Sequence, residues 1–467
     1  MEPSAFNVRA ALPGRDEVFL MNTLTDAQAV VSAAVVDLLE RAERGVSPSE
    51  LSADERAALD ALAAEGFLVN GRVDERAALE RFFADFRDDP TQLRVTVLTT
   101  LQCNFACGYC IQGDHGDYNR HAGRMSLEEA GRVASWIESR LDAVSPESFV
   151  LTFFGGEPLL NLPVVYYLAE RLWQAAVDRR VTMLVNVITN GLHLTPEVVD
   201  RLSACGLNGV KVTLDGDRVT HDRMRPLRGG QGTFDRIVSN LRAVAGRCRI
   251  SIGGNFDETS IHAYPALLAF LREQDFAASI AKVNFKPVIG TSRSANTGHI
   301  PLTPVAADGK PLGGTCMSTV GTGGGSPCDS CHFVDEQLAT LRAETRRHGF
   351  PTPDGLHMGP CEIHKRHAHT VGPDGSLYAC PGFAAESAHA VGHIGAAPKR
   401  AHEEAAARFE SLAAWRHCGD CAFIPVCGGG CTVASHNELG DMHAPTCHKA
   451  SFESALAELA QDVAGQG

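Results

Sequence analysis

Three closely spaced cysteines, Cys103, Cys107 and Cys110, are the residues of this chain with the clearest capacity for chemistry. They follow the apolar run LRVTVLTT, so we expect them on a loop that leaves a strand. Thiolates at this spacing can hold one corner of a [4Fe–4S] cluster, which usually has four cysteine ligands. Three ligands leave one iron with an open position for a group that is not protein. A zinc site completed by Asp114 or His115 is the alternative, but C-x3-C-x2-C is more typical of an iron–sulfur cluster.

A second motif, Gly155-Gly156-Glu157-Pro158, ends the next predicted strand. Two glycines allow the backbone to approach a ligand closely. The carboxylate of Glu157 offers an acceptor to a cationic ammonium group. Such a turn is common by itself, but its place one strand after the cysteine motif points to a shared site.

With these two motifs the chain resembles the radical S-adenosylmethionine (SAM) enzymes, whose cysteine motif has an aromatic residue before its last cysteine, here Tyr109. The resemblance implies that the three cysteines hold a catalytic cluster whose open iron is chelated by SAM. One electron then cleaves SAM to methionine and a 5′-deoxyadenosyl radical, which abstracts a hydrogen from the substrate. It also implies that Tyr109, Gly155, Gly156 and Glu157 bind SAM, with Glu157 at the amino group.

Later segments are similar to the same family. Ile188-Thr-Asn190-Gly and Val212-Thr213-Leu-Asp215-Gly look like its TNG and SLDG segments, with Thr213 where Ser is usual, and HDRMRPLRGGQGTF contributes Arg225. The resemblance implies that Asn190, Thr213, Asp215 and Arg225 bind the cofactor, with the Thr213 hydroxyl near the SAM carboxylate or ribose. For Asn190, Asp215 and Arg225 a turn or a surface ion pair is the alternative.

Seven further cysteines crowd the last part of the chain and resemble the SPASM domain, which holds auxiliary [4Fe–4S] clusters in a subset of radical SAM enzymes. They are Cys361, Cys380, Cys418, Cys421, Cys427, Cys431 and Cys447. The resemblance implies an outer cluster on Cys418, Cys421, Cys427 and Cys447, and an inner one on the other three.

Two clusters need eight ligands, and seven cysteines are one short. Cys316, Cys328 and Cys331 lie just upstream in a Gly-rich stretch and are candidates for the eighth ligand, with Cys328 or Cys331 ahead of Cys316. Substrate is the other candidate ligand for the open iron. A separate zinc site on these three cysteines and His332 is the minority alternative.

The elements that must position these residues alternate between strands and helices from residue 93 onward. Strands are expected at 94–100, 149–154, 183–188, 209–214, 249–254 and 281–287, and helices near 127–142, 163–179, 196–204, 234–246, 261–274 and 334–348. Continuous apolar strands separated by helices predict an α/β fold with a parallel sheet. We therefore expect a partial (β/α)6 TIM-type barrel, with the motifs at the carboxyl ends of its strands.

The first 90 residues predict a winged-helix-like module. EVFLMNTLTDAQAVVS has the alternation of a hairpin, residues 32–43 have helical spacing, and Ser52 to Glu55 predict a capping box for a second helix that Gly66 ends. FLVNGRV then predicts a short wing. A module that only packs against the rest of the enzyme is as well supported by these residues as one that binds a peptide. The expected organisation is a winged-helix-like peptide recognition domain at 1–90, the radical SAM barrel at 91–290, a Gly-rich linker and helix at 291–354, and an iron–sulfur SPASM domain at 355–467.

Composition excludes several classes of protein. A formal net charge of −14 and a pI near 5.7 argue against a nucleic-acid binder. No apolar run approaches the ~20 residues of a membrane span, and the first residues lack the pattern of a secretory signal. We therefore expect a cytoplasmic protein with no membrane partner. Because reducing cytosol disfavours disulfides, the clustered cysteines among the fifteen are expected to bind metal or to react. Cys205 and Cys248 stand alone and are expected to be buried small apolar residues.

Enzymes with a radical SAM core and a SPASM domain commonly modify peptides or proteins. The amino-terminal module is similar to the recognition domains of enzymes that mature ribosomally made peptides (RiPPs), which bind a leader as an added strand. The resemblance implies an oxidoreductase that uses SAM and three [4Fe–4S] clusters to install a thioether or carbon–carbon crosslink. Its expected partners are a precursor peptide with a leader and an electron donor such as flavodoxin or ferredoxin.

Two alternatives compete with this function. An anaerobic sulfatase maturase would form formylglycine, but in that family an Asp that acts as a base follows the second SPASM cysteine, and here Pro381 follows Cys380. A non-catalytic iron–sulfur redox protein is disfavoured by the two intact motifs of the barrel.

Overall fold

The centre of the molecule is a nine-stranded sheet in the order β11-β10-β9-β8-β7-β6-β12-β13-β14. The computed structural model describes residues 1–112, 122–289, 329–357, 359–447 and 449–466. Six consecutive strands of the sheet are parallel to their neighbours: β6 (Gln92–Thr100), β7 (Ser148–Gly155), β8 (Thr182–Thr189), β9 (Leu207–Thr213), β10 (Ile250–Phe256) and β11 (Ile280–Pro287). The predicted α/β class and all six predicted strands are confirmed.

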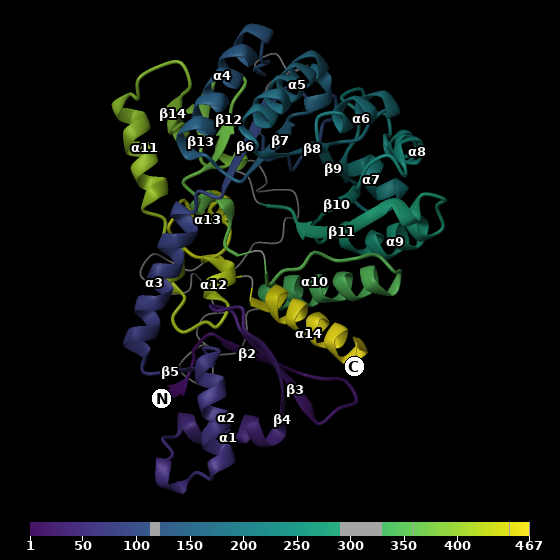
Figure 1. Ribbon diagram of the computed structural model, residues 1–467. Coiled ribbons are helices and arrows are strands. Elements are labelled where there is room, and N and C mark those ends of the chain that lie inside the picture. The colour runs from purple at the N-terminus through teal and green to yellow at the C-terminus, as the bar shows by residue number, and fades with distance from the viewer. Residues whose placement is uncertain (113–121, 290–328, 358, 448, 467) are drawn as a thin grey trace.

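Helices cover the outer side of this curved sheet (Figure 1). They are α4 (Leu127–Val144), α5 (Leu162–Arg179), α6 (Pro196–Ser203), α7 (Arg218–Met224), α8 (Phe234–Val244) and α9 (Tyr264–Arg272). Side-chain oxygens cap several of them, as where Ser126 accepts from the Glu129 amide in the first turn of α4. The outward-facing side chains of the strands and the inner faces of the helices form the largest hydrophobic core. This core fixes the strand ends where the motifs lie.

The sheet continues past β6 into the carboxyl-terminal part of the chain. β12 (Ala368–Val371) pairs in parallel with β6, and β13 (Ser376–Tyr378) and β14 (Gly392–His393) follow in antiparallel order. The turn between β12 and β13 places Gly375 at φ +84°, where an L side chain is strained. Cys380 follows this hairpin by two residues, so the hairpin places it next to the barrel.

The amino-terminal part forms a separate three-stranded antiparallel sheet. Its strands are β2 (Asn7–Ala11), β3 (Glu17–Asn22) and β4 (Gln28–Ser32), followed by α1 (Ala33–Glu43), α2 (Ala53–Ala64) and α3 (Arg72–Asp88). The predicted hairpin, both helices and the Ser52–Glu55 capping box are present. The predicted wing differs: β5 (Leu68–Val69) pairs with β1 (Glu2–Pro3), and the rest of that segment enters α3.

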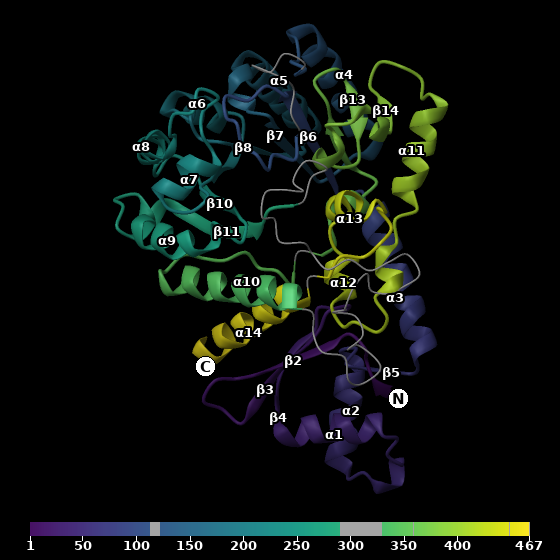
Figure 2. The ribbon, with the colours of Figure 1, turned by 180° about the vertical axis from the view of Figure 1, so that it is seen from behind.

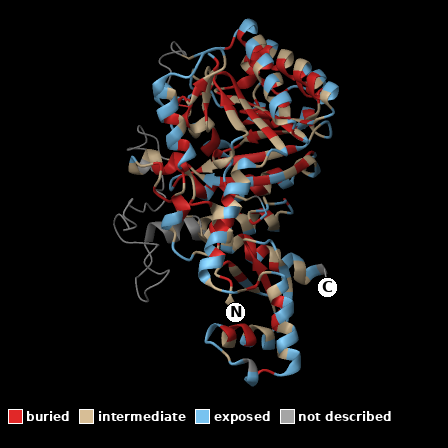
Figure 3. Ribbon diagram, turned by 60° about the vertical axis from the view of Figure 1, so that its left-hand side comes forward, coloured by how far each residue is buried: buried red, intermediate tan, exposed pale blue. Residues whose placement is uncertain are grey.

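Residues 1–90 share much of their hydrophobic packing with the carboxyl-terminal region. One cluster, which includes Leu38 and Phe67, belongs to the module itself. A second joins Phe19 to Leu456, and in a third Phe83 stacks on Trp415 with ring centroids 4.4 Å apart. Figure 3 shows buried residues continuing from the amino-terminal sheet to its neighbours. The module therefore does not pack as an independent unit.

Two helices separate the barrel from the amino-terminal sheet in both Figure 1 and Figure 2. These are α10 (Asp329–Arg347) and α14 (Lys449–Gln466), and α14 also contacts β2. A largely buried ion pair joins them, because Arg342 Nη2 lies 2.6 Å from Glu458 Oε2. The remaining helices are α11 (Arg400–Glu410), α12 (Ile424–Cys427) and α13 (Thr432–Leu439). No helix of the described residues has the length and apolar character needed to cross a membrane.

Candidate active site at the strand ends

A cavity of about 220 Å³ opens where the carboxyl ends of β6 to β11 converge. The loop after β6 contributes one wall, and the ends of β7, β8, β9, β10 and β11 contribute the others. Most of the predicted site residues of the barrel line it: Cys103, Cys107, Tyr109, Cys110, Gly155, Gly156, Asn190, Thr213 and Arg225. Glu157 and Asp215 lie behind this lining.

The three thiols of the first motif are held on a loop whose first half is fixed by two backbone hydrogen bonds to the segment after α7. The Ala106 amide donates to the Pro226 carbonyl at 2.9 Å, and the Arg228 amide donates to the Asn104 carbonyl at 3.0 Å. The pKa of Cys103 and that of Cys107 are both raised to about 11, mainly by burial. The neighbouring thiol contributes in each case: Cys107 raises the pKa of Cys103, and Cys110 raises that of Cys107. Thiols in such surroundings stay protonated at neutral pH unless a metal takes the place of the proton.

The glycine pair brings the end of β7 against the cysteine loop. A Cβ on Gly156 would lie 2.3 Å from the carbonyl oxygen of Gln102, and one on Gly155 would lie 2.3 Å from that of Thr100. Gly155 also has a φ of +129°. The sequence suggested that these glycines make room for a ligand; the structure shows that they first make room for the backbone that carries Cys103.

Glu157 is fully buried and its carboxylate faces the end of β8. It accepts hydrogen bonds from the Thr189 hydroxyl at 2.7 Å, the Asn190 amide at 2.7 Å and the Leu159 amide at 3.0 Å. Burial raises its pKa, and these donors oppose that shift. In this arrangement Glu157 positions Asn190, whose side-chain amide reaches Asn104 of the cysteine loop at 2.7 Å. Its contact with a SAM amino group stays a prediction.

Tyr109, Asp215 and Arg225 form one buried polar cluster. The Tyr109 hydroxyl donates to Asp215, and Arg225 Nη1 donates to the same hydroxyl at 2.6 Å and lies 3.6 Å from Asp215 Oδ2. Asp215 is also held by the Asn255 amide at 2.7 Å. The suggested carboxylate partner of Arg225 is therefore a residue of this chain. Its buried Nε has no partner among the described residues.

Sequence reasoning missed several polar side chains of the cavity, Gln112 and Asn284 among them. Asn255 lies at the end of β10, Lys211 lies within β9, and Lys286 lies near the end of β11. Lys211 stands two residues before Thr213 on the same face of its strand, a period-two signal that could have found it. Asn255 and Lys286 carry no motif that the sequence displays.

The described carboxyl-terminal cysteines lie near one another in two sets, and their binding of auxiliary clusters stays a prediction. Burial raises the pKa of Cys418, and the nearby Cys427, Cys421 and Cys447 add to the shift. Burial likewise raises the pKa of Cys380 to about 12, with Cys361 and Cys431 adding to it. A cavity beside β6 and β12 is lined by Cys361 and Cys380.

The candidates for the eighth ligand are not placed by the structure. Cys316 and Cys328 lie outside the described residues, as do Asp114 and His115 of the zinc alternative. Cys331 belongs to α10, and its side chain lies outside the described atoms. Cys205 is buried, as expected of a small apolar residue, and Cys248 packs against the same core.

The grouped thiols suit iron–sulfur clusters better than single metal ions. Within the described ranges, no three His, Cys, Asp or Glu side chains lie close enough together to hold one ion. In a four-iron cube each thiolate binds a different iron, so its ligands stand farther apart than those of one ion. The first group also borders a cavity where the buried Arg225 Nε and Gln112 Oε1 have no hydrogen-bond partner among the residues that the structure describes. Cys103, Cys107 and Cys110 therefore fit a cluster with a polar ligand beside it.

Comparison with known proteins agrees with this geometry. Residues 97–254 match the Radical SAM superfamily. This chain has a radical SAM domain. The radical SAM resemblance predicted from the motifs is thereby confirmed, together with a [4Fe–4S] cluster and SAM as the cofactors of such a domain.

Relatives and solved structures share this domain to different extents. The chain is 34% identical over 146 residues to a GTP 3′,8-cyclase of Synechococcus sp. (strain WH7803), and 30% identical over 146 residues to an AdoMet-dependent heme synthase of Methanosarcina barkeri (strain Fusaro / DSM 804). These matches cover 30% and 31% of this chain, and 39% and 37% of those proteins. This chain thus spans about two fifths of the length of these relatives.

A solved structure of native anSMEcpe with bound AdoMet shares the fold more widely. It superimposes with a TM-score of 0.56 at 16% sequence identity, and the match covers 80% of this chain and 100% of that one. The shared fold therefore extends beyond the radical SAM domain.

Replacing Gly156 by Ala is expected to remove the cluster of the barrel selectively. The new methyl group would collide with backbone carbonyls at 2.3 and 2.5 Å and displace the Cys103 loop. Iron analysis after anaerobic reconstitution should show a loss of about four iron atoms per chain. Gly108→Ala is the matched control, because Gly108 lies in the same loop with no atom within 4 Å of an added Cβ. Equal iron contents in the two variants would contradict this account.

Replacing Cys103, Cys107 and Cys110 together by Ala should lower the iron content as much as Gly156→Ala does, and should abolish the cleavage of SAM. We expect the variant to lose about four iron atoms and all reductive cleavage of SAM, measured as 5′-deoxyadenosine by liquid chromatography. Retained cleavage would show that the radical chemistry starts elsewhere.

Proposed function

We propose that this protein matures a ribosomally made precursor peptide, installing a thioether or carbon–carbon crosslink by radical SAM chemistry. The observation that carries the proposal is the amino-terminal sheet with an open strand edge, in the same chain as a radical SAM domain. Such an edge offers backbone groups to an extended peptide. The proposal treats residues 1–90 as a peptide recognition domain and residues 355–467 as a SPASM domain.

The open edge belongs to β4, which among the described residues pairs with β3 only, whereas α14 contacts the other edge strand, β2. The Asn22 amide donates to the Ala27 carbonyl at 2.9 Å, so residues 27, 29 and 31 are the hydrogen-bonded positions of this ladder. Gln28 and Val30 therefore direct their amides away from β3. Val30 is 42% exposed, which leaves an apolar contact for a leader strand.

The residues at the strand ends have distinct tasks in this proposal. SAM bound beside a cluster on Cys103, Cys107 and Cys110 supplies the radical that removes a substrate hydrogen. Glu157 holds Asn190 against the cysteine loop, and Asp215 with Arg225 holds the Tyr109 hydroxyl. These contacts fix the wall of the cavity, so that the reacting groups meet in one orientation.

The inner cysteine group lies beside this cavity. Gln112, just after Cys110, donates from Nε2 to the Pro381 carbonyl at 3.0 Å, which joins the loop of the first group to that of Cys380. Closing a crosslink removes two hydrogens from the peptide: one leaves as an atom, and the other as a proton and an electron. A cluster on Cys361, Cys380 and Cys431 would take that electron. Flavodoxin or ferredoxin would supply the electron that starts the reaction.

Support for a peptide substrate also comes from the fold likeness. anSMEcpe has been solved with bound AdoMet and the Cp18Cys peptide. The curated relatives are named for GTP and heme chemistry, and their matches cover under two fifths of their own lengths. Sulfatase maturation, forming formylglycine, is the weaker candidate, because Pro381 has no proton-accepting side chain next to Cys380.

The proposal is tested with the reconstituted enzyme, SAM, a reductant and candidate precursor peptides encoded beside its gene. We expect a peptide lighter by two hydrogens for each crosslink, with one 5′-deoxyadenosine formed per crosslink, read by mass spectrometry. A thioether would also protect one cysteine from alkylation. A peptide from a sulfatase serves as the comparison, and its conversion in place of the precursor would contradict the proposal.

Val30→Pro should weaken leader binding without breaking the β3–β4 ladder. Proline removes an amide that faces the open edge and is tolerated on edge strands. We expect a raised KM for the full precursor and an unchanged rate of SAM cleavage without peptide. Val30→Thr, which keeps the amide, is the control. Equal KM values for the two variants would show that the leader does not pair with β4.

A further inference from the structure

Lys211 is a cation placed inside the barrel without an opposing charge. It lies on β9, where buried Val210 and Val212 face the helices and Lys211 faces the cavity. A Cβ on Gly253 would lie 2.7 Å from Lys211 Cε, so the side chain crosses β10 at a glycine. The absence of a side chain at Gly253 is what lets this lysine stretch across the cavity floor.

Among the described residues that line this cavity there is no Asp or Glu. Arg225 is balanced by Asp215, but no ion pair among the described residues includes Lys211 or Lys286. The pKa of Lys211 is lowered to about 8, mainly by burial, with smaller contributions from the charges of Lys286 and Lys282. An ammonium group desolvated among other cations gains most from an anion placed beside it.

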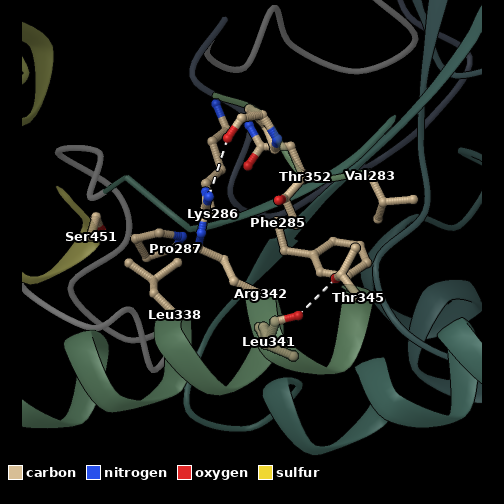
Figure 4. Close-up of a pocket in the computed structure, with 12 residues that line it drawn as sticks. Val283, Phe285, Lys286, Pro287, Leu338, Leu341, Arg342, Thr345, Thr352 and Ser451 are labelled. Atoms are coloured by element: carbon tan, nitrogen blue, oxygen red, sulfur yellow. Dashed lines mark hydrogen bonds between the residues drawn. The ribbon is translucent and has the colours of Figure 1, made fainter. Parts of the chain in front are cut away.

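Lys286 stands where two cavities adjoin. It lines the active-site cavity, and with Asn284 it also lines a second cavity between β11 and α10 (Figure 4). The second cavity is otherwise largely apolar, with Phe285, Leu338 and Leu341 on its walls. Its other cation, Arg342, is already paired with Glu458 at 2.6 Å. Lys286 is thus the cation at the junction that no carboxylate of the described residues pairs, and its charge opposes the rise in pKa that burial causes at the nearby Cys380 thiol.

We propose that Lys211 and Lys286 together bind a carboxylate of the peptide substrate, so that an acidic side chain or the chain terminus anchors the reacting segment. This inference rests on the proposed function and adds the class of peptide that the site selects. Lys211 precedes Thr213 by two residues of the strand, so Lys211 lies about 6–7 Å deeper in the barrel than Thr213 does. The motif residues that border the cysteines lie at the strand ends, so this depth favours substrate over the carboxylate of SAM.

The test is competitive acetylation of the reconstituted enzyme with acetic anhydride, followed by peptide mass spectrometry of each lysine. The probe is N-acetylglutamate α-amide, and its neutral match is N-acetylglutamine amide. At about ten times its dissociation constant, the acidic probe should slow labelling of Lys211 about tenfold. The neutral probe should not, and Lys399, exposed at the start of α11, should be unaffected by either.

Two further arms decide the source of the anion and the pairing of the lysines. SAM alone should leave labelling of Lys211 unchanged; protection by SAM would assign the site to the cofactor and overturn the proposal. In Lys211→Met, which keeps an apolar stem of similar length, the probe should lose its protection of Lys286. Equal effects of both probes would also overturn it. The readout needs no peptide turnover, so a failed maturation assay and a failed subsite remain distinguishable.

Discussion

Burial of thiols in three groups is the constraint on which the rest of this structure depends. Desolvation raises the pKa of cysteines in each group, and each group adds like charges if its thiols ionise. Such an arrangement is unfavourable unless a cation takes the place of the protons. The carboxyl-terminal region contributes only small hydrophobic clusters of its own. Binding of iron would therefore supply much of the free energy that folds this region, and the barrel supplies the surface on which it folds.

Polar contacts between successive strand ends convert the sheet into a site. Glu157 after β7 holds the turn after β8, and Asn190 of that turn reaches the cysteine loop after β6. Asp215 after β9 joins Tyr109 of the same loop to β10. Because each contact spans neighbouring strands, a shift of one strand would alter the position of the cysteines. The parallel register of the sheet therefore determines the geometry of the thiols.

The barrel could be predicted from the sequence because its strands are continuous apolar runs and its motifs follow them directly. The spacing of Cys103, Cys107 and Cys110 indicates one group, since close sequence neighbours stay close on a loop. The division of the carboxyl-terminal cysteines into two groups came from the resemblance to the SPASM domain, because Cys431 lies with Cys361 and Cys380 although Cys427 is its near neighbour in sequence. α11 and α14 were not predicted, because the many cysteines of their region obscure its helical periodicity. β5 was predicted to be part of a wing, because its partner β1 lies more than sixty residues away in the sequence. The orientation of the Glu157 carboxylate toward the end of β8 depends on tertiary contacts that no local sequence pattern encodes. The same holds for the placement of Lys211 in a cavity whose described lining has no Asp or Glu.

The parallel pairing of β12 with β6 has a consequence for synthesis on the ribosome. β6 is the first strand of the barrel to be made, yet one of its edges is covered only when residues 368–371 appear. At typical elongation rates that interval lasts roughly 15–50 s. During this time a long apolar strand presents unpaired backbone groups, which invite pairing with other chains. The edge of β6 is therefore exposed to pairing with other chains until residues 368–371 have been made.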